Sequence, residues 1–492
     1  MILLTAVAIS ACRDHEPPSL VAPTAKPSLQ SVQPSQGRSP FGRFRPGEEH
    51  SVALANEVPG FGGFFIDEAG NLHAYLLDVK QAGSARAALA RVLAERQRGY
   101  TETERRLRTR SDVVIHQGQF TFLQLADWRN QIENFTTAVP GVVWVGLDEH
   151  VNRVAMGVDR TRPATVEALV ARKLTQLGIP REVVSFVSAD PITTQTECDP
   201  TAVDCQDPCT LNPDDPSCQT EDDPCTLDPG ACTDPGSLNP EDPSFSFSYD
   251  ASAPAKTLGS PFERMFGGIR IHNAAAGGVC TLGFPVWYDG QYAFVTNSHC
   301  TPTEEYPDIN SYFRQPNWNV RPLAVAQEWK DPYKRSSGFR IADASVALMI
   351  NNFNVYLGYV ARPATRAFGR YAIVGDTTLA SGSSPWIRII GEGAVVKDQL
   401  FDKIGATTGW SYGYARYACV KRGNFECVSW VAASAWDGDS GAPVLRYYTN
   451  NTALLVGMVY AKESGGFWMN PISQIRRHLD ASGSSAHRMY TY

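Results

Sequence analysis

The stretch Trp436-Asp437-Gly438-Asp439-Ser440-Gly441-Ala442-Pro443-Val444 carries the chemistry that most restricts the fold of this 492-residue chain. A serine hydroxyl is a poor nucleophile until a base removes its proton. The oxyanion formed by its attack needs backbone NH donors, which a bulky neighbouring side chain would obstruct. Glycines stand on both sides of the Asp439-Ser440 pair and leave that access open. Ser440 is therefore a candidate nucleophile, and a base and a carboxylate should lie upstream.

A candidate base lies in Phe294-Val295-Thr296-Asn297-Ser298-His299-Cys300, at the end of a β-rich stretch. Cys300 follows His299 directly, and Cys280, twenty residues earlier, is a candidate disulfide partner. Such a bridge would fix the backbone that carries the base and contribute about 2 to 4 kcal/mol. His116 and His272 lack this context, so we expect them to be structural or surface residues.

A candidate carboxylate, Asp343, heads the apolar, strand-like run Ala344-Ser345-Val346-Ala347-Leu348-Met349. A buried carboxylate needs a partner, because desolvating an isolated charge costs several kcal/mol. The imidazole of His299 would be such a partner. Taken alone, Asp343 fits the cap of a turn equally well. Asp343 is of interest because it completes a histidine, an aspartate and a serine in this order along the chain.

Together these three segments resemble the chymotrypsin-like serine peptidases, and the streptogrisin-like bacterial branch fits best. The stretch Asp402-Lys403-Ile404-Gly405-Ala406-Thr407-Thr408-Gly409-Trp410 resembles that branch's strand after the interdomain crossing. The resemblance covers Gly267 to the end of the chain. It implies that Ser440 is acylated, that His299 is general base and then acid, and that Asp343 orients the imidazole. The backbone NH groups of Gly438 and Ser440 would form the oxyanion hole.

The resemblance also implies a fold for residues 258–492. We expect two six-stranded antiparallel β-barrels with the active site between them, and a short helix near 471–479. Cys419 and Cys427 are candidates to clip the hairpin after residue 410. Asp439 resembles the residue that pairs with a freed N-terminus in other branches, but the sequence has no Ile-Val-Gly-Gly activation site. No cofactor and no metal is expected.

Substrate preference is less defined by the sequence. Ser434, six residues before the nucleophile, is uncharged, which does not indicate a preference for Lys or Arg at the cleaved bond. Tyr460 stands where the family usually has a small residue lining the cleft. We expect an apolar or aromatic preference.

Charge is strongly segregated along the chain. The net charge is -7, yet the stretch 197–250 holds fourteen Asp or Glu and no Lys or Arg, so the rest carries +7. The positive residues are scattered and no nucleic-acid motif accompanies them, which argues against a nucleic-acid partner. Asp-Pro-Cys-Thr-Leu occurs at 207–211 and again at 223–227. These acidic repeats are candidates for calcium binding, but their proline density favours a solvated spacer.

Eleven cysteines point to an oxidising compartment. Cys12 stands alone, six lie from Cys198 to Cys232, and Cys280, Cys300, Cys419 and Cys427 follow. The ten without Cys12 form an even set, as disulfides require. Zinc is the competing interpretation of the middle six, but that stretch has no histidine and no paired CxxC spacing.

The first residues are apolar and end in Ile9-Ser10-Ala11-Cys12, which resembles a bacterial lipoprotein signal. This implies a signal peptide over 1–11, cleavage before Cys12 and a lipid anchor on its sulfur. An ordinary secretory signal is the alternative. Both predict export, as a cell-envelope lipoprotein or as a secreted protein after processing. The proline-rich residues 12–50 are expected to be a disordered tether.

Residues 51–190 are expected to form a small α+β domain. A hairpin over 64–77 and a helix over 84–108 precede the order β, α, β, β, α, β from Val113 to Val187, a split βαβ arrangement. The run 140–159 resembles the pro-domains of streptogrisin-like and α-lytic-type proteases. We therefore expect a pro-domain that assists folding and inhibits, then an acidic linker over 191–257.

The sequence thus predicts a serine endopeptidase that is made as a proenzyme. Its partners would be protein or peptide substrates and its own pro-domain, with membrane contact only through Cys12. One rival hypothesis is a non-catalytic binding module with a protease-like fold, against which the complete set His299, Asp343 and Ser440 argues. A second rival keeps the mechanism but has ester substrates.

Overall fold

The computed structural model describes residues 43–67, 71–96, 113–136, 138–191, 255–303, 310–317, 319–331, 340–369, 377–381, 385–448 and 450–480. Cys12, the six cysteines from Cys198 to Cys232 and the acidic repeats lie outside these ranges. Within these ranges, no helix is long and apolar enough to cross a membrane.

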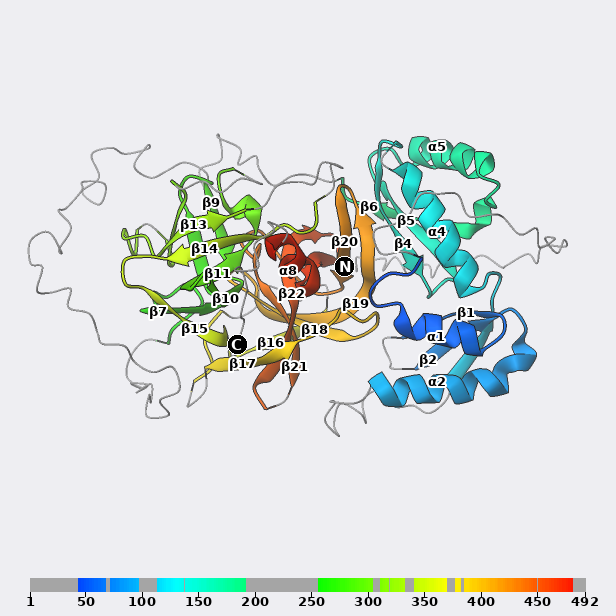
Figure 1. Cartoon of the computed structure of the whole chain (residues 1–492), viewed down its shortest axis with the longest axis horizontal. Helices are drawn as coiled ribbons and strands as arrows, with labels where there is room; N and C mark the ends of the chain where they lie inside the picture. The colour runs from blue at the N-terminus through cyan, green and yellow to red at the C-terminus, as the bar shows by residue number, and fades with distance from the viewer. Residues whose placement is uncertain are drawn as a thin grey trace, which may run out of the picture. The chain divides into compact units, whose positions relative to one another are not determined.

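The N-terminal part, residues 43–191, begins with a three-stranded sheet (Figure 1). Strand β1 (Phe61–Ile66) pairs antiparallel with β2 (Leu72–Leu76), which confirms the predicted hairpin. Strand β2 pairs in parallel with β3 (Val113–Gln117). Helix α1 (Glu49–Glu57) precedes this sheet, and α2 (Ala82–Arg96) lies between β2 and β3 in the chain.

A second group of strands follows, with β4 (Val142–Asp148) antiparallel to β5 (Arg153–Asp159) and β5 parallel to β6 (Val184–Ala189). Helices α4 (Phe122–Thr136) and α5 (Pro163–Gln176) pack on these strands (Figure 1). Helix α5 starts with proline in its first turn and buries Val166, Val170 and Leu174 along one face. These elements match the predicted ones in type and order.

The predicted split βαβ unit is nevertheless wrong in one respect, because β3 does not lie beside β4, β5 and β6. It pairs with β2 instead, as parallel strands joined through a helix do. Asn152, in the turn between β4 and β5, links the two groups of strands. Its amide accepts from the backbone NH groups of Gln119 and Phe120 and donates to the carbonyl of Gly62 in β1.

Residues 255–480 are built mainly from strands, which confirms the all-β prediction for the described part of this half. The predicted C-terminal helix is α8 (Ile472–Asp480). A seven-stranded sheet has the order β10-β11-β14-β13-β12-β8-β9. Its strands are β8 (Arg270–Asn273), β9 (Gly278–Thr281), β10 (Phe284–Tyr288), β11 (Gln291–Thr296), β12 (Tyr312–Arg314), β13 (Ala326–Lys330) and β14 (Ser345–Met349).

The other strands of this half belong to a thirteen-stranded sheet that also contains β4, β5 and β6. They are β7 (Arg264–Gly267), β15 (Asn354–Ala361), β16 (Arg366–Phe368), β17 (Trp386–Glu392), β18 (Leu400–Gly405), β19 (Gly409–Arg422), β20 (Phe425–Val431), β21 (Pro443–Tyr448), β22 (Thr452–Glu463) and β23 (Gly466–Pro471). The junction is an antiparallel pairing of β19 with β4, in which Arg422 faces Trp144. The N-terminal part thereby extends the sheet of the C-terminal half.

One large core lies between the two sheets of the C-terminal half. It includes Phe294 of β11, Ile404 of β18 and Leu455 of β22, all fully buried. The turn that carries His299 follows β11 directly, and Ser440 lies three residues before β21. Both candidate catalytic segments are therefore attached to strands whose other side chains fill this shared core.

Candidate active site

His299 lies in the single 3-10 turn η6 (Ser298–Cys300). Its Nδ1 is 2.6 Å from Oδ2 of Asp343, and the side chains are 9% and 5% exposed. The second carboxylate oxygen, Oδ1, accepts from the backbone NH groups of Ser298 and His299 at 2.8 and 3.2 Å. Asp343 therefore holds both the imidazole and the turn that carries it.

The surroundings of Asp343 keep it ionised. Burial alone raises the pKa of Asp343, but the charges of His299 and Arg340 and the hydrogen bonds from His299 outweigh it and hold that pKa well below its usual range. Arg340 is buried, with Nη2 3.6 Å from Oδ1 of Asp343 and 3.8 Å from Oδ1 of Asp331. Asp331 also accepts a hydrogen bond from the hydroxyl of Ser298.

Ser440 lies in a loop that is fixed by the neighbouring carboxylate of Asp439. Oδ1 of Asp439 accepts from the NH groups of Thr407 and Thr408, and Oδ2 accepts from Nζ of Lys403 at 2.9 Å. Both side chains of the Lys403–Asp439 pair are fully buried. Burial lowers the pKa of Lys403, and the charge of Asp439 opposes that shift. The Ser440 loop is thus attached to β18 by an ion pair inside the protein.

Two glycines of the Ser440 loop have a backbone conformation that requires glycine. Gly438 has φ of +91° and Gly441 has φ of +88°, values that side chains rarely adopt. A Cβ on Gly441 would meet the carbonyl oxygen of Thr281 at 2.2 Å. The NH groups of Asp439 and Gly441 donate to Trp436 and Val459. Those of Gly438 and Ser440 donate to no other residue that the structure describes, so they remain available to an oxyanion.

Thr281 joins the serine loop to the histidine turn. Its backbone NH donates to the carbonyl of Ser440 at 2.8 Å, and its hydroxyl donates to the carbonyl of Gly438 at 2.8 Å. The preceding residue, Cys280, forms a disulfide with Cys300, next to His299. The predicted bridge is therefore present, and a short covalent and hydrogen-bonded path connects the segments of Ser440 and His299.

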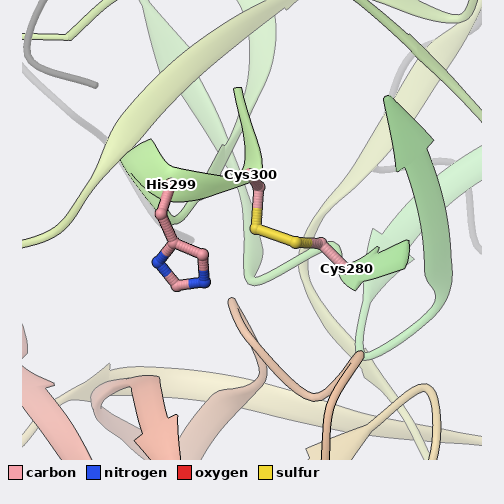
Figure 2. A group of neighbouring side chains, drawn as sticks. All are labelled: Cys280, His299 and Cys300. Carbon is pink, nitrogen blue, oxygen red and sulfur yellow. A yellow bond between two sulfur atoms is a disulfide. The ribbon is translucent and has the colours of Figure 1, made fainter. Parts of the chain in front are cut away.

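The imidazole of His299 lies beside the Cys280–Cys300 disulfide (Figure 2). A histidine and two cysteines within 4.8 Å of one another resemble a metal-binding group. Both sulfurs are here in a disulfide, however, and a metal ligand must be a thiolate. The two cysteines of this group therefore form a structural disulfide, and the imidazole lies beside it.

The second predicted bridge, Cys419–Cys427, is also present and clips β19 to β20. Ser434 and Tyr460 are both buried. Burial raises the pKa of Tyr460 to about 12, with Arg422 opposing and Asp343 adding to the shift, and its hydroxyl accepts from Arg422 at 3.2 Å. The predicted lipidation site, Cys12, lies outside the described residues.

Three residues of this region were not identified from the sequence. Lys403 stands 36 residues before its partner Asp439, and Thr281 contacts Ser440 across 159 positions of sequence, so neither has a local signal. Arg422 looks like an ordinary surface cation near the end of a strand, yet it is 5% exposed. A charged residue in a strand whose polar and apolar residues otherwise alternate is only a weak sequence signal of a buried cation.

Comparisons with known proteins give structural matches only. No family model matches the sequence, and no curated protein matches it. Thermobifida fusca Protease A is 21% identical, with a TM-score of 0.31 over 46% of this chain and 100% of that one. A glutamic acid specific serine protease is 18% identical, with a TM-score of 0.32 over 46% and 100%. Cellulomonas bogoriensis chymotrypsin is 19% identical, with a TM-score of 0.30 over 46% and 98%.

Proposed function

We propose that this protein is a serine endopeptidase that hydrolyses peptide bonds through an acyl-enzyme. The observation that carries the proposal is the buried contact of His299 Nδ1 with Asp343 Oδ2 at 2.6 Å. The same part of the structure holds the loop of Ser440. Thr281 donates to the carbonyl of Ser440, and the neighbouring Cys280 is bonded to Cys300, next to His299. An imidazole fixed by an ionised carboxylate, in the same part of the structure as a serine loop with two available NH groups, suits acyl transfer.

In this mechanism Asp343 accepts from Nδ1 of His299 and leaves Nε2 to act as the base. Nε2 takes the proton of the Ser440 hydroxyl as Oγ attacks the peptide carbonyl carbon. The oxyanion is stabilised by the NH groups of Gly438 and Ser440. The protonated imidazole then gives its proton to the leaving amine. Water, activated in the same way, releases the acyl group.

For the fold, we propose that the two sheets of residues 258–492 form the two β-barrels of a chymotrypsin-like enzyme, with more strands in each sheet than the six expected. The shared core between β11 and β18 supports this arrangement. We further propose that the chain is exported, because the disulfides Cys280–Cys300 and Cys419–Cys427 suit an oxidising compartment. An anchor on Cys12 would keep the protein at the cell envelope.

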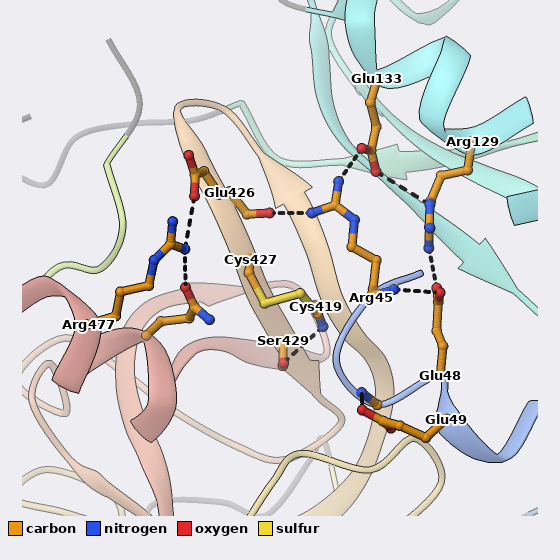
Figure 3. Close-up of a disulfide and its surroundings, with 12 residues drawn as sticks. Arg45, Glu48, Glu49, Arg129, Glu133, Cys419, Glu426, Cys427, Ser429 and Arg477 are labelled. Carbon is orange, nitrogen blue, oxygen red and sulfur yellow. Dashed lines mark hydrogen bonds and ion pairs between the residues drawn. A yellow bond between two sulfur atoms is a disulfide. The ribbon is translucent and has the colours of Figure 1, made fainter. Parts of the chain in front are cut away.

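We propose that residues 51–190 are the pro-domain of this enzyme. Two sets of contacts support the proposal. The first is the pairing of β4 with β19 and a nearby ionic network that reaches β20 (Figure 3). In it, buried Arg45, which precedes residues 51–190, contacts Glu133 of α4 and donates to the carbonyl of Glu426 at 2.9 Å, so it links α4 to β20. A pro-domain bound in this way could template the β19–β20 hairpin during folding.

The second set of contacts lies at a cavity that is also lined by residues 434–436, shortly before Ser440 in the chain. The NH of Asp190 donates to Glu463 at 3.3 Å, and its carboxylate accepts from the NH of Ser464 at 3.2 Å. Glu463 and Ser464 lie just after the stretch that contains Tyr460, which we expect to line the substrate cleft. A segment of the pro-domain in this place would exclude substrate, and inhibition follows from that.

The catalytic proposal is tested by treating the purified chain with a fluorophosphonate after limited proteolysis within residues 191–257 and removal of the inhibitory N-terminal part. We expect one equivalent to attach to Ser440, as identified by peptide mass spectrometry, and none in Ser440→Ala. A non-catalytic binding module would give no labelling in either protein. Cleavage of a denatured protein at peptide bonds then separates a peptidase from an esterase with the same triad.

The pro-domain proposal is tested by producing residues 258–492 with and without residues 43–191 supplied as a separate chain. We expect active protein in quantity only when both are present, and inhibition when the N-terminal part is in excess. Prompt folding of 258–492 alone to full activity would show that the N-terminal part is not required.

A further inference from the structure

A cavity of about 490 Å³ lies next to the Ser440 loop. One wall is formed by the residues that precede the nucleophile, 434–436, and the other by the end of β22 and the turn after it, 461–466. Asp190 and Pro191 of the N-terminal part also line it, together with Arg160 and Arg422. This position makes the cavity a candidate for the pocket that receives a substrate side chain.

Arg422 is an unusual residue for the wall of such a cavity. Its side chain is 5% exposed, and its Nη1 donates to the hydroxyl of Tyr460 at 3.2 Å. Its guanidinium carbon is 5.2 Å from the centre of the Trp468 ring and 5.7 Å from that of Tyr460. Among the described residues, its Nε has no hydrogen-bond partner, and no carboxylate lies within ion-pair distance of it.

The other charged groups of the cavity are engaged elsewhere. Arg160 pairs with Asp190 at 2.7 Å, and both belong to the N-terminal part. Lys462 pairs with Asp437 at 2.5 Å. Glu463 accepts from Nε1 of Trp468 at 2.6 Å, and burial raises the pKa of Glu463, which Arg422 opposes.

Glu463 acts on Arg422 through its charge but forms no ion pair with it, so the buried guanidinium is only partly compensated, which is costly. Its cation–π contacts with Trp468 and Tyr460 compensate only part of the lost hydration. A carboxylate entering the cavity would provide both a counter-charge and an acceptor for a guanidinium donor. An apolar group in the same place would leave the guanidinium without either.

We propose that the cavity binds the side chain preceding the cleaved bond, and that Arg422 makes the enzyme selective for Asp or Glu at that position. The inference rests on the peptidase function proposed above and names its substrate class. It differs from the apolar or aromatic preference expected from Ser434, because Ser434 is only one part of the wall and Arg422 comes from another strand.

The test uses peptide substrates that differ only in the residue before the cleaved bond, namely Glu, Gln, Phe or Lys. The protein is used after removal of its N-terminal part, and its active concentration is set by fluorophosphonate titration of a separate sample. We expect kcat/KM for Glu to exceed that for Gln about 100-fold, since the two side chains differ mainly in charge. We also expect Arg422→Met to abolish this difference, and Arg422→Lys to retain part of it.

Arg388→Met is the matched control, because Arg388 is an exposed arginine on β17 that does not line the cavity. We expect it to leave the Glu-to-Gln ratio unchanged. If Ser440 reacts but wild-type protein cleaves Gln or Phe substrates as well as Glu, the specificity inference is wrong while the peptidase proposal stands. If Ser440 does not react at all, the proposed function itself fails. The comparison of Glu with Gln and Phe substrates uses wild-type protein alone, so it tests the inference even if Arg422→Met misfolds.

Discussion

Asp343→Asn is expected to lower kcat about 10,000-fold while leaving the chain folded. The carboxylate accepts from Nδ1 of His299 at 2.6 Å and thereby fixes the tautomer in which Nε2 is the base. An amide can donate to Nδ1 instead, which favours the wrong tautomer. The measurement is kcat on a peptide substrate, per mole of folded protein. If maturation is autocatalytic, full-length chain should also accumulate.

Asp331→Asn is the control for this substitution. Asp331 is also a buried carboxylate near Arg340 and accepts from the Ser298 hydroxyl, whereas Nδ1 of His299 is held by Asp343. We therefore expect a change in kcat of less than about tenfold. A similar collapse of kcat in both variants would indicate a general disturbance of the turn. Near wild-type kcat in Asp343→Asn would contradict the orienting role.

The same variant should change the pH dependence of stability. The folded protein holds the pKa of Asp343 below its unfolded value of about 3.9. The resulting stabilisation is present above pH 4 and is lost as the pH falls towards the folded pKa. The difference in unfolding free energy between wild type and Asp343→Asn should therefore shrink below about pH 4.

Lys403→Met is expected to destabilise the protein by about 3 to 5 kcal/mol. Methionine fills a similar volume, but it leaves the fully buried carboxylate of Asp439 without its cation. Asp439 also holds the loop whose NH groups form the proposed oxyanion hole, so activity should fall further than stability alone explains. The measurements are denaturant unfolding and kcat at a temperature where the variant is folded.

Lys462→Met is the matched control, since Lys462 pairs with Asp437, two residues before Asp439 in the same loop. These two side chains are 43% and 67% exposed. Exposed pairs of this kind contribute less than about 1 kcal/mol, so we expect a small change in stability. If both lysine variants lose the same stability, the burial of Lys403 has no special role in holding the loop.

Much of the site could be predicted from the sequence because its signals are local. The glycines around Ser440 and the cysteine beside His299 stand within a few positions of the residues they serve. The bridges Cys280–Cys300 and Cys419–Cys427 join residues 20 and 8 positions apart, and both are present. The pairing of His299 with Asp343 was predicted from resemblance, and the structure supplies the contact.

Hydrophobic periodicity and short motifs act over a few residues, and from them the order of the elements and the residues that can do chemistry could be predicted. Three features follow from the tertiary structure alone: β3 pairs with β2, Lys403 forms an ion pair with Asp439, and Arg422 lines the cavity next to residues 434–436. Each of these depends on which strands become neighbours. That choice is made by packing in the shared core, between side chains too far apart in sequence to leave a local pattern.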